Sequence, residues 1–321
     1  MRKSEYKVSV VIPVYNEEGC VSGLTERLIK VLVGYYDYEI LFVDDGSQDN
    51  TLTILKKLHS DNQKINFLSF SRNFGHQNAL RAGTKYATGD CIVSLDGDLQ
   101  HPPELIPDLI SKWNEGYDIV YTIRKEVKKI SFFKIVTARL FYKIMNAISD
   151  VNFDHGEADF RLLDKNAASE LNNLHENAIF FRGMVKWLGF NQTGIEYTPD
   201  SRFWGETKYS QKKMFALAIS GITSFSIKPL RISTLIGLSI AFLSLLYGVY
   251  ALYIKFFTDN SIEGWTSVFF MVTFIGGIQL IMIGILGEYI GKIFIESKKR
   301  PHYIIKENSF DNMKCENDVL V

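Results

Sequence analysis

The chain of 321 residues has no surplus of charge of either sign, because 36 Lys and Arg residues balance 36 Asp and Glu residues. A protein that binds nucleic acid through bulk electrostatics is usually basic, so we expect no nucleic-acid partner. Cysteine is scarce as well. Cys20, Cys91 and Cys315 are widely spaced and odd in number, so they form neither a metal-finger spacing nor a disulfide framework, which fits a reducing compartment.

Two common nucleotide-binding signatures are also missing. No G-x-G-x-x-G motif opens the first predicted helix, and the sequence contains no Walker A lysine loop. Dinucleotide-binding and P-loop functions therefore lose support.

What the chain does have is a pair of long apolar runs near its end. Residues 232–254 and residues 264–287 contain no charged side chain. As a helix, each run would extend about 35 Å, enough to cross a hydrocarbon core about 30 Å thick. A buried core helix would explain one such run, but two in close succession favour a transmembrane hairpin. Neither run carries an interior charge, which disfavours a small transporter.

The charges that flank these runs predict their orientation. The segment between the runs carries Lys255 against Asp259 and Glu263. The outer flanks are basic, with Lys212, Lys213, Lys228 and Arg231 before the runs and Lys292, Lys298, Lys299 and Arg300 after them. The positive-inside rule then predicts a multi-pass protein with both termini, and everything before residue 230, in the cytoplasm.

This orientation divides the chain into three predicted parts. Residues 1–229 form a cytoplasmic domain, residues 230–295 form the two-helix transmembrane hairpin, and residues 296–321 form a polar cytoplasmic tail. From about Lys306 the tail has few apolar anchors, so we expect it to be mobile.

Strand and helix patterns alternate in the first part. Apolar, strand-like segments lie at residues 8–12, 39–43, 65–69, 91–95 and 118–121, and helical patterns lie at residues 19–33, from about 49, and at 76–87. Continuous apolar strands separated by helices predict an α/β fold whose mainly parallel sheet is covered on both faces. Ligands of such sheets bind beyond the carboxyl ends of the strands.

Polar clusters follow these predicted strand ends. The most informative lies in residues 94–104 (SLDGDLQHPPE), where Asp96, Asp98 and the Gln100 amide oxygen can face one hard cation. Gly97 permits a tight turn there. Oxygen ligands too few for a closed cage suit Mg²⁺ or Mn²⁺ shared with substrate phosphates. An isolated acidic surface turn is the alternative, but three further polar clusters, at residues 16–17, 44–45 and 72, converge on the same edge.

Two segments combine basic and apolar character. In residues 128–149, five apolar side chains share an arc of a helical wheel, with Arg139 and Lys143 roughly opposite. Residues 209–228 lead into the first apolar run. We expect interfacial helices in both segments, with an ordinary surface helix as the alternative for the first.

These residues resemble glycosyltransferase family 2, and within it the polyprenyl-phosphate glycosyltransferases similar to dolichyl-phosphate mannose synthase and bacterial bactoprenol glucosyltransferases. The matching motifs are, in chain order, residues 12–18 (IPVYNEE), 43–47 (VDDGS), 71–75 (SRNFG), 94–104, 158–163 (ADFRLL), 181–183 (FRG) and 202–210 (RFWGETKYS). The resemblance implies a GT-A fold followed by two transmembrane helices. It also implies a nucleotide-diphosphate sugar donor, a divalent metal, a polyprenyl phosphate acceptor and a lipid bilayer, which would be a bacterial-type cytoplasmic (inner) membrane.

The resemblance assigns roles to residues around the donor. It places Pro13, Tyr15, Glu17 and Asp44 around the nucleobase and ribose, and Arg202 and Lys208 near the diphosphate. It places the metal on Asp96 and Asp98, with Gln100 as a third ligand. A plain turn with a helix cap would also explain Asp45 and Ser47.

The resemblance places the acceptor phosphate near Arg124, with Arg139 and Lys143 as further contacts, and makes Asp159 the candidate base. The second pKa of a phosphate monoester is about 6, so this nucleophile is already largely dianionic and Asp159 is equally suited to orienting it. A salt bridge with Arg161 is the alternative for Asp159. His101 is expected to be structural rather than a ligand.

The sequence therefore predicts an inverting hexosyltransferase that uses a nucleotide sugar, with UDP-glucose suggested by the resemblance, and undecaprenyl or another polyprenyl phosphate at the cytoplasmic membrane face. A transferase of the same fold with another lipid, polysaccharide or protein acceptor is an alternative. A non-catalytic membrane module that binds nucleotide sugars is another. Whether the chain forms a homo-oligomer stays open.

Overall fold

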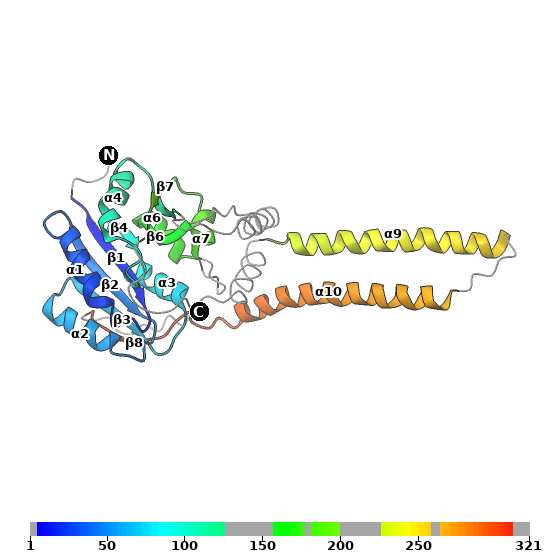
Figure 1. Cartoon of the computed structure of the whole chain (residues 1–321), viewed down its shortest axis with the longest axis horizontal. Helices are drawn as coiled ribbons and strands as arrows, with labels where there is room; N and C mark the ends of the chain where they lie inside the picture. The colour runs from blue at the N-terminus through cyan, green and yellow to red at the C-terminus, as the bar shows by residue number, and fades with distance from the viewer. Residues whose placement is uncertain are drawn as a thin grey trace. The chain divides into compact units, whose positions relative to one another are not determined.

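The computed structural model describes residues 5–125, 157–174, 176, 181–199, 226–257 and 264–310. These residues belong to two units, and each is considered by itself. The first unit contains the residues before 200 together with residues 299–310, and the second contains the two long helices (Figure 1). Both segments predicted as interfacial helices lie outside the described residues, apart from residues 226–228.

The first unit has an alternating order of strands and helices in its N-terminal half. Its strands are β1 (Lys7–Val14), β2 (Asp37–Asp44), β3 (Ile65–Phe70), β4 (Cys91–Ser94), β5 (Ile119–Arg124), β6 (Glu157–Asp164), β7 (Gln192–Tyr197) and β8 (Ile305–Asn308). Its helices are α1 (Val21–Leu32), α2 (Thr51–Asp61), α3 (His76–Tyr86), the short 3₁₀ turn η1 (Pro103–Leu105), α4 (Ile106–Asn114), α6 (Lys165–Asn172) and α7 (Phe181–Trp187).

The eight strands among the described residues form one sheet in the order β7-β5-β6-β4-β1-β2-β3-β8. Strand β1 pairs in parallel with both β2 and β4, and β2 pairs in parallel with β3. Strand β6 lies antiparallel between β4 and β5, and β7 is parallel to β5. The prediction of an α/β domain with a mainly parallel sheet is confirmed.

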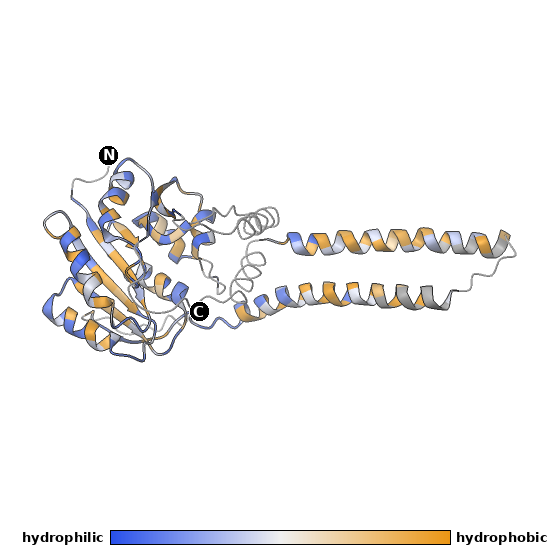
Figure 2. Ribbon diagram, in the orientation of Figure 1, coloured by the Kyte–Doolittle hydropathy of each residue, from blue (hydrophilic) through white to orange (hydrophobic). Residues whose placement is uncertain are grey.

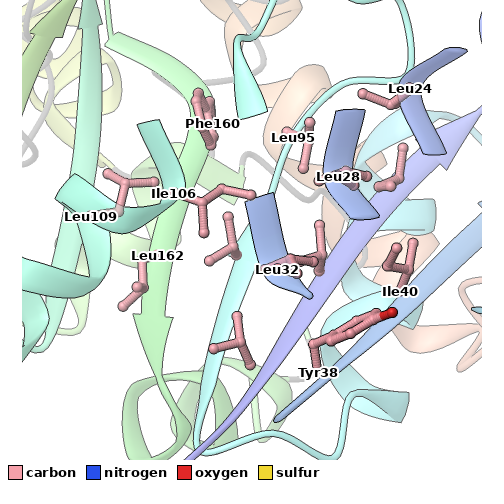
Figure 3. Packing of buried hydrophobic residues seen from close by; sticks show 14 of the residues in the cluster. Leu24, Leu28, Leu32, Tyr38, Ile40, Leu95, Ile106, Leu109, Phe160 and Leu162 are labelled. Carbon is pink, nitrogen blue, oxygen red and sulfur yellow. The ribbon is translucent and has the colours of Figure 1, made fainter. Parts of the chain in front are cut away.

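Apolar side chains cover both faces of this sheet. On one face, Leu24, Leu28 and Leu32 of α1 pack with α4 and the sheet, as Figure 3 shows. On the other face, Ala79 and Ala82 of α3 pack on β2 and β3. Because successive strand residues point to opposite faces, the apolar runs of β1 and β2 contribute to both cores. This packing fixes the strand ends that carry the polar clusters.

Helix α3 approaches β1 so closely that only glycine fits at position 83. A Cβ atom on Gly83 would lie 2.1 Å from Cγ1 of Val11. We expect Gly83→Ala to destabilise the protein by about 1–3 kcal/mol through overpacking. A Cβ atom on Gly23 of α1 would meet no described atom within 4 Å, so Gly23→Ala should be neutral or stabilise by up to about 1 kcal/mol. Thermal unfolding of the two variants in one detergent tests this difference, and equal midpoints would contradict it.

The second unit contains helices α9 (Lys228–Phe257) and α10 (Trp265–Ser297). Each contains a stretch long and apolar enough to cross a membrane, Lys228–Tyr247 and Phe274–Ser297, and no part of the chain that the structure describes buries either stretch. Figure 2 shows apolar residues along both helices, and large side chains such as Leu238, Phe242 and Leu280 are exposed. Exposed apolar surface of this extent is unfavourable in water, so a lipid bilayer is the environment that suits these helices. The expected pair of apolar helices is present.

The residues after α10 differ from the expectation. The tail was expected to be mobile from about Lys306, yet Ile305–Asn308 form β8, which pairs antiparallel with β3 at one edge of the sheet. The expectation is wrong for residues 306–310, because apolar side chains at the start of the polar strand and on either side of it pack against the domain. Tyr303, Ile305 and Phe310 pack against the core under α3.

Candidate active site

The candidate site lies at the edge where the parallel strands β1, β2, β3 and β4 end, as expected for such a sheet. The loop after β1 is bound to the loop after β2 at several points. The backbone N–H of Asn16 donates to Ser47 Oγ at 2.9 Å, and Asn16 Oδ1 accepts from Gln48 N at 2.8 Å. The N–H of Glu17 donates to Thr51 Oγ1. These bonds hold Tyr15 and Glu17, both half-buried, beside the end of β2.

Asp44 ends β2, Asp45 follows it, and both side chains are almost fully buried. Asp44 Oδ1 accepts from Ser47 N at 3.0 Å, and Oδ2 accepts from Ser69 Oγ at 2.7 Å. Asp45 instead accepts from the backbone of the loop after β3, namely Phe74 N and Gly75 N. Burial and the neighbouring charge of Asp44 raise the pKa of Asp45 despite these bonds. A turn thus explains the bond of Asp44 to Ser47 N, whereas the two backbone bonds of Asp45 run to the loop after β3 and are not explained by a turn with a helix cap.

The acidic turn after β4 is held from two sides by histidines. His76 Nε2, at the start of α3, lies 2.8 Å from Asp96 Oδ1. The backbone N–H of Asp96 donates to Nδ1 of His101, whose ring is buried and stacks on Phe160. Burial opposes charge on the His76 ring, but its hydrogen bond to Asp96 and the carboxylate charge raise the pKa of His76 to about 9.

The same turn approaches the end of β1. A Cβ atom at Gly97 would lie 2.7 Å from Val14 Cγ1, so a larger residue would push the turn away from β1. Asp98 Oδ1 accepts from Gln100 N, and Gln100 Oε1 accepts from Arg124 Nη2 at 2.6 Å. Arg124, the exposed last residue of β5, therefore lies directly beside the acidic turn.

The oxygen ligands of this turn form an incomplete set for a metal ion. In the described ranges, no group of three or more His, Cys, Asp or Glu side chains is placed to hold a cation. Asp96, Asp98 and the Gln100 amide could supply up to three oxygens, leaving positions for phosphate oxygens or water. This donor set fits an oxygen-preferring divalent ion that is shared with a substrate, and it does not fit a closed structural site.

Asp159 lies next to the acidic turn through the register of the sheet. Ser94 of β4 pairs with Arg161 of β6 in an antiparallel ladder, and Ser94 Oγ donates to Asp159 O at 2.7 Å. Two residues beyond Ser94 the chain reaches Asp96, and two residues before Arg161 it reaches Asp159. The candidate base on β6 and the first candidate metal ligand, in the turn after β4, therefore belong to neighbouring parts of the sheet edge.

One face of β6 is charged where the other is apolar. Glu157, Asp159 and Arg161 alternate with core residues and are buried. Helix α7 covers this charged face with two cations spaced by one helical turn. Arg182 forms a two-pronged ion pair with Asp159, at 2.7 Å and 3.0 Å, and Lys186 lies 3.0 Å from Glu157.

This pairing decides the protonation of Asp159. Burial by itself would raise the pKa of the Asp159 carboxyl, but Arg182 and then Arg161 outweigh it and hold that pKa well below its usual range. Arg161 Nη2 is 3.6 Å from Asp159, so Arg182 is the principal partner and the salt bridge with Arg161, the alternative considered from the sequence, is secondary. A carboxylate bound in this way is a weak proton acceptor at neutral pH.

The structure thus brings a subset of the predicted site residues to one edge. Asp44, Asp96, Asp98, Gln100, Arg124 and Asp159 lie there, as do Tyr15 and Glu17, while Pro13 lies buried within β1. Arg139, Lys143, Arg202 and Lys208 lie outside the described residues. The roles of all these residues stay predictions.

Sequence reasoning gave no role to His76 or Arg182, although both lie inside or next to the quoted motifs. His76 directly follows the 71–75 motif and reaches Asp96. Arg182 is the central residue of the 181–183 motif and reaches Asp159 across 23 positions of sequence. The presence of a charged residue inside a motif was the available signal, but only the fold shows the partner.

The fold and the polar edge define a GT-A type domain followed by two apolar helices. Comparison with family models agrees with this class: residues 9–171 match glycosyl transferase family 2, and residues 228–293 match the GtrB C-terminal hairpin. The chain belongs to glycosyl transferase family 2.

Curated relatives resemble the chain over nearly its whole length. The uncharacterized glycosyltransferase YkcC of Bacillus subtilis is 44% identical over 94% of this chain and 93% of its own. The prophage bactoprenol glucosyl transferase homolog of Escherichia coli K12 is 41% identical over 94% of this chain and 98% of its own. The bactoprenol glucosyl transferase of Shigella phage SfV is also 41% identical, with the same coverage.

Solved structures with a similar fold are more distant. TarS of S. aureus, solved as residues 1–349 in complex with UDP-GlcNAc, is 18% identical over 68% of this chain and 66% of its own, with a TM-score of 0.47. Glucosyl-3-phosphoglycerate synthase of Mycobacterium tuberculosis, solved with Mn²⁺ and UDP, is 16% identical over 68% of this chain and 78% of its own, with a TM-score of 0.45.

Proposed function

We propose that this protein transfers glucose from a nucleoside-diphosphate sugar to a polyprenyl phosphate, with inversion at the anomeric carbon. The observation that carries the proposal is full-length similarity to bactoprenol glucosyl transferases, which includes the C-terminal hairpin as well as the catalytic domain. A hairpin of bare apolar helices also suits an enzyme whose acceptor is a lipid.

The tail strand supports a cytoplasmic location for both ends of the hairpin. Strand β8 follows α10 in the chain and yet pairs with β3 of the catalytic domain. This pairing favours a chain that returns to the side of the membrane from which it started, with an even number of crossings. The basic flanks of the two apolar runs favour the cytoplasm as that side.

The donor would bind along the strand ends, with its base near Tyr15, Glu17 and Asp44 and its diphosphate near Asp96 and Asp98. When bound there, a divalent cation would neutralise charge that develops on the leaving diphosphate. The contact of His76 with Asp96 Oδ1 keeps that carboxylate in one orientation. UDP-glucose is the first donor to test.

The acceptor would enter beside Arg124, which attracts its phosphate. An oxygen of the lipid phosphate attacks the anomeric carbon from the face opposite the leaving group, the glycosidic C–O bond breaks, and the nucleoside diphosphate leaves with the bonding electrons. Because the phosphate monoester is largely dianionic above about pH 6, this step requires no proton acceptor. Asp159 then serves to hold Arg182 in place, so that the guanidinium can face the acceptor phosphate.

A transfer assay tests the proposal directly. Purified protein in nanodiscs receives radiolabelled UDP-glucose, undecaprenyl phosphate and Mg²⁺, and the label is followed into the organic phase. We expect a lipid-linked product that requires all three components and carries the inverted anomeric configuration by NMR. UDP-galactose, UDP-GlcNAc and GDP-mannose, tested in parallel, define the donor.

The alternatives give different patterns in the same assay. A transferase with another acceptor would leave the polyprenyl lipid unlabelled and would release UDP only by transferring the glucosyl group to water, and a non-catalytic binding module would retain UDP-glucose unchanged. Absence of labelled lipid with every donor in the panel would contradict the proposal.

A further inference from the structure

The segment that follows the membrane hairpin completes the catalytic sheet at β3. In β8, Asn308 pairs with Leu68, Glu307 with Ser69 and Ile305 with Phe70. Just before the strand, the ring of Tyr303 stacks on Phe70, with ring centres 5.0 Å apart and planes 12° from parallel. The C-terminal segment therefore covers the last residue of β3, where the candidate site begins.

This segment also holds the loop after β3, residues 71–75. The backbone N–H of Ser71 donates to Ile304 O at 2.9 Å. The Phe70 ring, which Tyr303 covers on one side, contacts Phe74 edge to face. The Arg72 guanidinium in turn lies 4.1 Å from the centre of the Phe74 ring.

The 71–75 loop is in direct contact with the candidate donor site. Its Phe74 and Gly75 N–H groups donate to the Asp45 carboxylate, next to Asp44. A Cβ atom at Gly46 would lie 2.5 Å from the carbonyl carbon of Arg72, so the two loops touch at their backbones. The loop ends at the start of α3, where His76 contacts Asp96.

We propose that the C-terminal segment is a working part of the donor site, in which Tyr303 and Ile304 position the 71–75 loop for binding of a nucleoside diphosphate. The identity of the ligand rests on the proposed function. Tyr303 is a positioning residue, because it acts through Phe70 and Phe74 on Asp45, Arg72 and His76. Donor affinity then depends on a segment that the chain reaches only after the membrane hairpin.

The opposite end of the same segment provides a matched control. Phe310 packs on Tyr86, with ring centres 6.4 Å apart, and Ser309 bonds Phe67. These contacts anchor the segment to α3 and to the middle of β3, and none of them touches the 71–75 loop. Phe310→Ala therefore removes a comparable aromatic contact without acting on the loop.

The experiment uses the full-length protein in nanodiscs with the variants Tyr303→Ala, Tyr303→Phe and Phe310→Ala. Binding of UDP with Mn²⁺ is measured by calorimetry, and hydrogen exchange is followed at the amides of residues 71–75. We expect Tyr303→Ala to weaken UDP binding about tenfold, the scale of one lost aromatic pair, and to speed exchange in the loop. Tyr303→Phe should restore both, and Phe310→Ala should lower the unfolding temperature with wild-type UDP affinity.

UDP affinity in Tyr303→Ala within twofold of wild type would overturn the inference, as would an equal loss in Phe310→Ala. If the wild type prefers another base, the measurement uses whichever of UDP, GDP, CDP and dTDP it binds. Binding of a nucleotide without transfer to lipid would contradict the proposed function. The inference would then be decided by the nucleotide affinities of the variants relative to wild type. Absence of any nucleotide binding by the wild type would reject both.

Discussion

Asp96→Ala is expected to lower the rate of transfer by about a thousandfold, which corresponds to about 4 kcal/mol of lost transition-state stabilisation. The reason is electrostatic. Asp96 is the candidate ligand that connects the cation to the leaving diphosphate, and His76 and His101 hold it in place. Without this carboxylate, the charge that develops on the diphosphate would have to be stabilised by the remaining groups of the turn.

The loss should appear in cation binding as well as in turnover. Electron paramagnetic resonance of added Mn²⁺ in the presence of UDP should show strong binding by the wild type and weak binding by Asp96→Ala. Asp108→Ala, which removes an exposed carboxylate from the first turn of α4, should match the wild type in both measurements. Full transfer by Asp96→Ala would show that the metal assignment of this turn is wrong.

Arg182→Met is expected to have the second-largest effect, because it leaves the Asp159 carboxylate buried without its principal partner. The Asp159 side chain is 8% exposed and that of Arg182 is 38% exposed. Removing one partner of a fully buried ion pair lowers the free energy of unfolding by about 3–5 kcal/mol. Because Arg182 is partly exposed, we expect a loss of about 2 kcal/mol here. We expect kcat/KM for the lipid acceptor to fall by about a hundredfold, with a smaller change in the KM for the donor.

The pH dependence of this destabilisation has a defined sign. In the wild type the pKa of Asp159 is depressed, so its contribution to stability is complete above about pH 4 and is lost only on further acidification. In Arg182→Met, burial would dominate and raise that pKa above the unfolded value. The variant should therefore be most destabilised near pH 7, and the difference in unfolding temperature should shrink towards pH 5.

A surface pair serves as the matched control for Arg182. Arg27 forms a two-pronged contact with Glu104, but both side chains are partly exposed. Arg27→Met should lower the free energy of unfolding by less than about 1 kcal/mol and leave the rate of transfer unchanged. Arg182→Lys keeps the positive charge but cannot form the two-pronged contact with Asp159. Its unfolding temperature and transfer rate should therefore lie between those of the wild type and Arg182→Met. A difference in unfolding temperature that is constant from pH 5 to pH 7 would contradict the assignment of Asp159.

The parallel half of the fold was predictable because its strands are continuous apolar runs. Residues of β1, β2 and β4 are buried on both faces, so sequence and structure agree there to within a few positions. Strand β6 was not predicted, since Glu157, Asp159 and Arg161 interrupt its apolar residues. Strand β8 was missed for a related reason: its four residues, Ile305–Asn308, are mostly polar and lie at an edge.

The candidate site was predictable where a motif directly follows a predicted strand, as for Asp44 and Asp96. Pairings across the fold were not predictable in the same way. A salt bridge with Arg161 was the alternative considered for Asp159, and in the structure Arg161 Nη2 lies 3.6 Å from Asp159 Oδ1, two residues away on the same face of β6. Side chains two residues apart on one strand point in the same direction, so they do not face each other end to end. A two-pronged contact requires a group that approaches from another element. Helix α7 supplies that group as Arg182.

The position of β8 has a consequence for biosynthesis. Until the ribosome has made the residues beyond α10, β3 remains an open edge with unsatisfied backbone N–H and C=O groups. The sheet of the catalytic domain can thus be completed only after both apolar helices have been synthesised. A nascent chain that stalls before this point exposes an edge prone to pairing with other chains, so the catalytic domain stays incomplete until residues 305–308 are made.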